Sequence, residues 1–136
     1  MKGLSIFYNG KKIRMHPNAY TDHGYGRGIP PFRTLEAGLS DEAFGKNIQD
    51  MLDHSKSGLP FKMITDEEVK AYFKAFGVRS DRQLGVGVHI TLEDSQYTVT
   101  PINKRGLFGE PEEVVEPSLL LHAVKNGLGL EEKEIA

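Results

Sequence analysis

The sequence contains no cysteine, so disulfide bonds and thiolate chemistry are both excluded. It also lacks an excess of positive charge: 17 lysines and arginines stand against 19 aspartates and glutamates, and the formal net charge is −2. General attraction to phosphates needs a concentrated basic face, so we expect no nucleic-acid partner. No apolar leader segment opens the chain, and no run of residues is long and apolar enough to span a bilayer. We therefore expect a cytoplasmic protein with no membrane partner.

The length and composition suit one folded unit. The 136 residues, of which 38% are hydrophobic, can bury about two-thirds of the surface that the unfolded chain exposes. We expect a single domain over residues 1–136.

The clearest local pattern is an alternation over residues 84–101. Apolar residues take every second position on both sides of a turn at 93–95: Val86, Val88, Ile90, Leu92, Tyr97 and Val99. This pattern predicts a β-hairpin with one buried face. Asn9-Gly10 predicts a second hairpin with a two-residue turn between strands near 4–8 and 13–15. Pro17 is expected at a strand end or sheet edge, followed by an irregular exposed loop over 18–38.

Three segments carry helix signals. Ser40 is the predicted N-cap of a helix whose apolar face is formed by Phe44, Ile48, Met51 and Leu52. Thr65 opens a capping box before a second helix, which ends at Gly77 and has an apolar face of Val69, Tyr72, Phe73 and Phe76. A third helix is predicted to start at Pro117, to bury Leu120, Leu121 and Val124, and to end at Asn126-Gly127. A short strand is expected over 113–115.

These elements predict an α+β fold: a central, mostly antiparallel sheet of about five or six strands with three packed helices. The order of elements repeats loosely between the two halves of the chain, which leaves open whether they form an internal duplication.

Residues able to do chemistry are scattered in the sequence. The five histidines (16, 23, 54, 89 and 122) show no metal-ligand spacing, and the glycines at 24–28 do not match the dinucleotide-binding pattern. We expect no metal, no cofactor and no enzymatic activity. His89 is expected to be a hydrogen-bonded strand residue. The Asp22-His23 pair has two interpretations. It is either part of a plain solvated loop or the acid-base group of a small hydrolase, with His16 or Arg27 nearby.

The order of elements resembles a known family. A helix of the form LSDEAFGKNIQDMLDHS, a strand-turn-strand that ends in YTVTP, a Gly-aromatic-Gly turn and a late leucine-rich helix are similar to those of the CdiI immunity proteins of bacterial contact-dependent growth inhibition systems. The chain departs from that pattern in its long GYGRGIPPF loop. The resemblance implies a cytoplasmic protein that binds and neutralises a cognate C-terminal toxin domain, often a nuclease.

Two groups of residues are candidates for contact with such a toxin. The first is an acidic cluster: Glu110, Glu112, Glu113 and Glu116. Nucleases are commonly basic where they hold their substrate, so this cluster could steer association, although runs of glutamate also occur as plain solvated faces. The second group comprises aromatic residues from the predicted loop that could serve as buried anchors: Tyr20, Tyr25 and Phe32. A non-enzymatic interaction module without a toxin partner is a further alternative.

Overall fold

The computed structural model describes residues 1–114 and 116–130, and within these residues the chain forms an eight-stranded sheet with four α-helices. The strands are β1 Lys2–Tyr8, β2 Lys12–Thr21, β3 Gly26–Gly28, β4 Arg33–Glu36, β5 Lys56–Leu59, β6 Val86–Glu93, β7 Gln96–Ile102 and β8 Glu112–Val114. The helices are α1 Asp41–His54, α2 Asp66–Ala75, α3 Asp81–Leu84 and α4 Leu120–Leu128, with a 3-10 turn at Pro117–Leu119 before α4. The predicted α+β class is confirmed, with more strands than the five or six expected.

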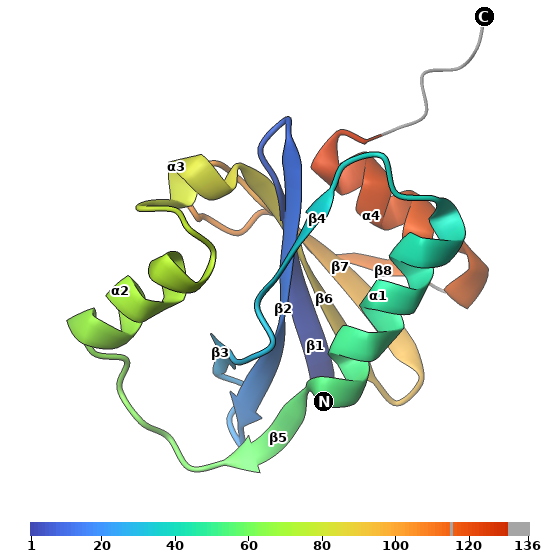
Figure 1. Ribbon diagram of the computed structural model, residues 1–136. Coiled ribbons are helices and arrows are strands. Elements are labelled where there is room, and N and C mark those ends of the chain that lie inside the picture. Colours follow the sequence, from blue (N-terminus) through green and yellow to red (C-terminus); the bar gives the residue numbers. More distant parts are fainter. Residues whose placement is uncertain (115, 131–136) are drawn as a thin grey trace, which may run out of the picture.

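The sheet has the order β3-β2-β1-β6-β7-β8, and β4 and β5 both pair with β2. All described pairings are antiparallel except that of β5 with β2. Helices α1 and α4 cover one face of the sheet, and α2 and α3 lie on the other (Figure 1). Among the described residues, no helix has the length and apolar content needed to cross a membrane.

The central hairpin forms as predicted. Strands β6 and β7 pair along their length, and Asp94 and Ser95 make a two-residue turn with φ angles of 50° and 64°. Positive φ at both positions gives the turn a twist that matches the right-handed twist of the two strands.

The N-terminal hairpin is present, but its turn differs from the predicted one. Tyr8 pairs with Ile13, so four residues connect the strands rather than two. The side-chain oxygen of Asn9 accepts hydrogen bonds from the backbone N–H groups of Lys11, at 2.9 Å, and Lys12, at 2.8 Å. Gly10 has a φ of 94°. The prediction of a two-residue turn was wrong because the asparagine closes the turn with its side chain.

Pro17 lies inside β2 and not at a strand end. β2 pairs with β1 as far as Leu4↔Pro17, and beyond this point it pairs with β3 and β5. The residue that lacks an N–H therefore marks the place where β2 changes partners. Because the strand continues to Thr21 and β3 and β4 follow, the irregular loop predicted over 18–38 is largely replaced by short strands.

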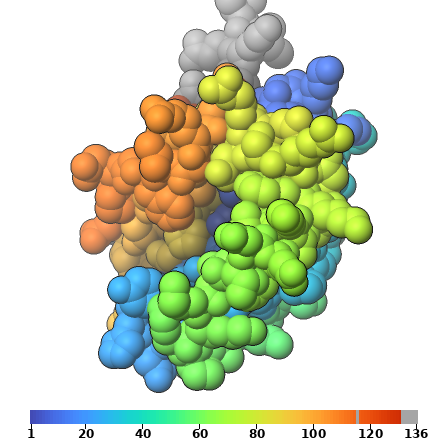
Figure 2. All heavy atoms as spheres, turned by 90° about the vertical axis from the view of Figure 1, so that its left-hand side faces the viewer, coloured from blue at the N-terminus to red at the C-terminus, as the bar shows by residue number. Residues whose placement is uncertain are grey.

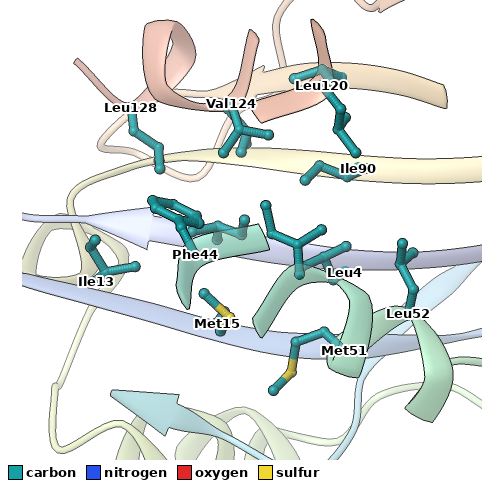
Figure 3. Close-up of a cluster of buried hydrophobic side chains, with 14 of the residues drawn as sticks. Leu4, Ile13, Met15, Phe44, Met51, Leu52, Ile90, Leu120, Val124 and Leu128 are labelled. Atoms are coloured by element: carbon teal, nitrogen blue, oxygen red, sulfur yellow. The ribbon is translucent and has the colours of Figure 1, made fainter. Parts of the chain in front are cut away.

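The main core lies between the sheet and helices α1 and α4 (Figure 3). The Ser40 hydroxyl caps α1 by accepting a hydrogen bond from the N–H of Ala43, and the helix buries the predicted face. Helix α4 runs past its predicted end to Leu128, and Gly129 caps it in the left-handed conformation. Gly127 instead permits close packing, since a Cβ there would lie 2.5 Å from a methyl group of Val88.

Helix α2 is attached more loosely to the opposite face. The capping box at Thr65 is present, but the predicted apolar face is only partly buried. Phe76 is buried just beyond the helix, Tyr72 and Phe73 are partly buried, and Val69 is exposed. This arrangement follows from the position of α2, which bridges a hollow over the sheet rather than lying flat on it.

Candidate functional site

A row of polar side chains crosses the sheet on the face under α2. Strands β1, β2 and β6 direct every second residue to this face, and the register places Ser5 opposite both His16 and His89. Asn18 and Tyr20 continue the row along β2. These five side chains form the floor of a cleft of about 470 Å³, which α2, α3 and the turn after β7 enclose. Figure 2 shows this hollow between the green-to-yellow helices and the orange segment, with the blue N-terminal strands at its base.

His89 is the centre of a hydrogen-bonded network in this floor. Its Nε2 lies 3.0 Å from the hydroxyl of Tyr20, and its Nδ1 lies 3.2 Å from Ser5 Oγ. Asn18 donates from Nδ2 to Ser5 Oγ at 3.1 Å. The prediction that His89 is a hydrogen-bonded strand histidine is confirmed, although it faces a cleft and belongs to a network of four side chains.

His16 connects the floor to α2. Its Nδ1 lies 2.9 Å from the carbonyl oxygen of Pro17, which can only accept, so Nδ1 carries the proton. The bare Nε2 then accepts from the Tyr72 hydroxyl at 2.8 Å. The rings of Phe32 and Phe76 pack around the same imidazole, at centroid distances of 5.5 and 5.8 Å.

The floor of the cleft is electrically neutral near pH 7. Burial lowers the pKa of both His16 and His89 from 6.5 to about 4, and the proximity of His89 lowers the pKa of His16 further. Burial also raises the pKa of Tyr20 and Tyr72, so both phenols stay protonated. The floor can thus offer neutral hydrogen-bond donors and acceptors between aromatic walls.

Strand β3 forms one wall of the cleft through close backbone approach. A Cβ on Gly26 would lie 2.8 Å from the Tyr20 ring, and one on Gly28 would lie 2.8 Å from the His16 ring. Between these glycines, Arg27 forms an ion pair with Glu68 of α2. The glycines therefore serve packing on the aromatic floor, and Arg27 ties β3 to α2 across the cleft.

The mouth of the cleft is rimmed by exposed apolar side chains. Nine large hydrophobic residues are exposed among the described residues, and seven of them lie at residue 25, in residues 61–69 or in residues 107–108: Tyr25, Phe61, Met63, Ile64, Val69, Leu107 and Phe108. Ile64, Val69 and Phe108 line the cleft itself. Tyr25 and Phe61 contact each other, with ring centroids 5.6 Å apart, beside a second hollow of about 510 Å³ that shares Tyr20 and Ile64 with the cleft. We call these seven residues the apolar rim. A gathering of this kind is typical of an interaction surface, because scattered single apolar residues are the ordinary case.

The structure separates the candidate contact residues that the sequence suggested. Tyr25 lies on the apolar rim and is 65% exposed, whereas Tyr20 is 2% exposed in the floor of the cleft and Phe32 is half-buried against His16. We therefore leave Tyr20 out of the proposed contact surface. The glutamates lie in and around β8, at the opposite end of the strand order from Tyr25: Glu110, Glu112, Glu113 and Glu116, all exposed.

The Asp22-His23 pair lies exposed in the turn between β2 and β3. His16 is buried and engaged with Tyr72, and Arg27 is paired with Glu68, so the groups named for the hydrolase alternative are not brought together. Ser5 and His89 form a hydrogen-bonded serine-histidine pair, but Ser5 is buried in the middle of β1 and not on a strained, exposed turn. Within the described residues, no group of three histidines or carboxylates could hold a metal ion.

Sequence reasoning missed the polar floor and most of the apolar rim. A signal for the floor existed, because Ser5, His16, Asn18 and His89 each interrupt an otherwise apolar strand, and His16 and Asn18 are two residues apart on the same strand. The rim also had a signal in the segment PFKMI at 60–64, where three apolar side chains accompany one proline and one lysine without any helical or strand period.

Solved structures of two other proteins share this fold. The protein of unknown function NMB0488 from Neisseria meningitidis matches with a TM-score of 0.71 at 12% identity, over 94% of this chain and 93% of that chain. A chain of the CdiA-CT/CdiI toxin and immunity complex from Yersinia pseudotuberculosis matches with a TM-score of 0.64 at 16% identity, over 95% of this chain and 94% of that chain. No protein-family model and no curated protein matches the sequence. At these identities the likeness establishes a shared fold, which is consistent with the CdiI type that the sequence resembles.

Proposed function

We propose that this protein is an immunity protein that binds and neutralises the toxin domain of a contact-dependent growth inhibition protein inside the cell. The observation that carries the proposal is the apolar rim around the cleft, because it gives an otherwise polar surface one area suited to a protein partner. The fold shared with a chain of a toxin and immunity complex supports the choice of partner. The toxin is proposed to be a nuclease on the strength of the family resemblance.

The chemistry of the cleft favours binding over catalysis. Both imidazoles of the floor are neutral and hydrogen-bonded on both ring nitrogens, and their partners are hydroxyl, amide and carbonyl groups. A catalytic set would need a carboxylate or similar group to orient the base beside an accessible nucleophile, and the two carboxylates that line the cleft, Glu68 and Asp81, are not among the hydrogen-bond partners of either histidine. The walls and rim, in contrast, offer aromatic surface of the type that supplies most of the binding energy in protein interfaces.

The apolar rim should supply most of the affinity for the toxin domain encoded next to this chain. Replacing Tyr25 and Phe61 together with alanine is expected to weaken binding by about 30- to 300-fold, mainly through faster dissociation, because both rings are exposed anchors in contact with each other. Leu119→Ala is the matched control, since Leu119 is also exposed but precedes α4 on the other side of the sheet. Surface-based kinetics with the purified toxin domain measure both rates.

The outcome separates two errors. If wild type does not bind the toxin domain, the immunity assignment is wrong. If wild type binds and the double variant dissociates as slowly as wild type, with an unchanged circular dichroism spectrum, then the rim is not the contact surface.

The glutamates near β8 are proposed to accelerate association with a basic toxin. Changing Glu110, Glu112 and Glu113 to glutamine should slow association by several-fold at low salt and have little effect at high salt, because exposed charges act mainly through long-range steering. A control with the same charge change on β4 and α1 is Glu36→Gln/Glu42→Gln/Asp53→Asn. Equal association rates for wild type and the first variant at low salt would remove this role.

A further inference from the structure

The cations on the cleft side of the molecule are strongly clustered. Residues 70–84 and 103–106 cover α2 beyond its acidic first turn (Asp66, Glu67 and Glu68), all of α3 and the turn after β7. They contain one anion, Asp81, and six cations: Lys70, Lys74, Arg79, Arg82, Lys104 and Arg105. We call these six residues the basic surface. Asp81 contacts this turn, since a Cβ on Gly106 would lie 2.9 Å from its carboxyl group, so α3 and the turn are neighbours. Figure 2 looks onto these elements, green to yellow for the helices and orange for the turn.

The basic surface is not neutralised by the rest of the described chain. Ion pairs involve Lys12, Arg27, Arg33, Lys46 and Lys125, and within residues 1–114 and 116–130 none includes a residue of the basic surface. Two hollows on this side are lined by its cations and by no carboxylate. One is formed by Lys70, Phe73, Lys74, Gly77, Val78 and Arg79, and the other includes Arg82 and Lys104.

This concentration of charge runs against the net charge of the protein. With Asp81 included, residues 70–84 and 103–106 carry a formal charge of +5, and because the whole chain carries −2, the remaining residues, which include the acidic first turn of α2, carry −7. Like charges packed on one surface repel one another, so a cluster of this size lowers stability unless a partner compensates it. The basic surface also adjoins the apolar rim, because Lys70 follows Val69 on α2 and Arg105 precedes Leu107 in the turn.

We propose that the basic surface binds a carboxylate-rich patch on the protein that occupies the apolar rim. The inference rests on the proposed function, and it adds that the toxin domain presents acidic side chains opposite α2, α3 and the turn after β7. A partner that is acidic there and basic opposite the glutamates of β8 would be oriented before contact, because the two charged surfaces of this chain have opposite signs.

A compact acidic patch fits this surface better than a nucleic acid. Double-stranded nucleic acid carries a dense and extended row of negative charges, about one per 1.7 Å of helix axis. Such a row would extend beyond the basic surface onto a remainder that carries −7 and repels it. An acidic patch on a protein can match the basic surface in size and does not meet that repulsion.

The test is association kinetics with the toxin domain encoded next to this chain. Lys70→Glu/Lys74→Glu is expected to lower the association rate about tenfold or more at low salt, with the difference largely lost near 0.5 M salt. Lys2→Glu/Lys46→Glu is the matched control, because it makes the same change in net charge on the face that α1 and α4 cover, and its rate is expected to stay within about threefold of wild type. Thermal melts of both variants verify the fold.

Each result supports or overturns the proposal. Equal effects of the two variants would mean that net charge and not the basic surface governs association. No effect of Lys70→Glu/Lys74→Glu would mean that the basic surface is not part of the interface. Either result overturns the inference and leaves the immunity function standing. If wild type binds a 20-base-pair RNA duplex at physiological salt and this variant does not, the surface belongs to nucleic acid. If wild type does not bind the toxin domain, both proposals fall.

Discussion

Replacing Phe44 with alanine should lower the free energy of unfolding by about 3–5 kcal/mol. Phe44 is 1% exposed, and its ring is enclosed by residues of β1, β2 and α4, so truncation removes a large apolar contact and leaves a cavity. Ile90→Ala should cost about 2–5 kcal/mol for the same reason on β6, where the side chain is fully buried. Urea unfolding followed by circular dichroism measures both changes.

Substitutions on α2 provide the contrast. Val69 is exposed at the rim of the cleft, so Val69→Ala should change stability by less than about 0.5 kcal/mol. Phe73 is only partly buried, and its truncation should cost less than that of Phe44, although both residues belong to apolar helix faces in the sequence. Near-native stability of Phe44→Ala would contradict the assignment of the main core.

Helix α1 and the central hairpin could be predicted because their signals are local. The cap at Ser40, the apolar residues at helical spacing and the alternation across Asp94-Ser95 all act within one turn of helix or one hairpin. These elements also form the main core, so local preference and tertiary packing agree. Helix α2 shows the limit of such signals, because its apolar face predicts a buried helix and cannot reveal that the helix spans a hollow.

Strands β3, β4 and β5 could not be predicted because each forms only by pairing with β2. Each has three or four residues, and all three pair with β2. β3 and β5 pair with the part of β2 that follows Pro17. Segments this short have no period of their own, and the open edges of a long neighbouring strand organise them. The proline that suggested a strand end instead marks a change of partners within one strand.

The polar floor depends on register, which the sequence did not specify. Ser5 meets His89 only because β1 and β6 pair antiparallel with these two residues opposite each other, 84 positions apart in the chain. A shift by one residue would move every side chain of β1 to the other face. The spacing of two residues could have indicated that His16 and Asn18 share a face of one strand, whereas bringing them together with Ser5 and His89 required the pairing of three strands.

The stability of this protein should fall steeply as the pH decreases from about 6.5 to about 4. His16 is buried and His89 is partly buried at the floor of the cleft, and both are neutral with pKa values lowered to about 4, whereas an unfolded histidine has a pKa near 6.5. In this window the unfolded chain binds protons that the folded chain cannot, so protonation favours unfolding. Above pH 6.5 both states are neutral at these positions and the contribution is constant; below about pH 4 the loss is complete. Each histidine contributes a slope of up to about 1.4 kcal/mol per pH unit.

Urea unfolding at half-unit steps from pH 7.5 to pH 4 tests this dependence. His89→Gln removes one titrating group and keeps a polar side chain. Between about pH 6.5 and pH 4, the histidine-dependent part of its stability loss should therefore be about half as steep as that of wild type, whatever its stability at pH 7. His23→Gln is the control, since His23 is exposed in the turn after β2, and its profile should run parallel to that of wild type. Carboxylates titrate in all three proteins, so only the difference between the profiles reports on the floor. Parallel profiles for wild type and His89→Gln would mean that His89 is protonated as readily in the folded protein as in the unfolded chain, and that the floor of the cleft is not the neutral surface inferred from its hydrogen bonds to Tyr20 and Ser5.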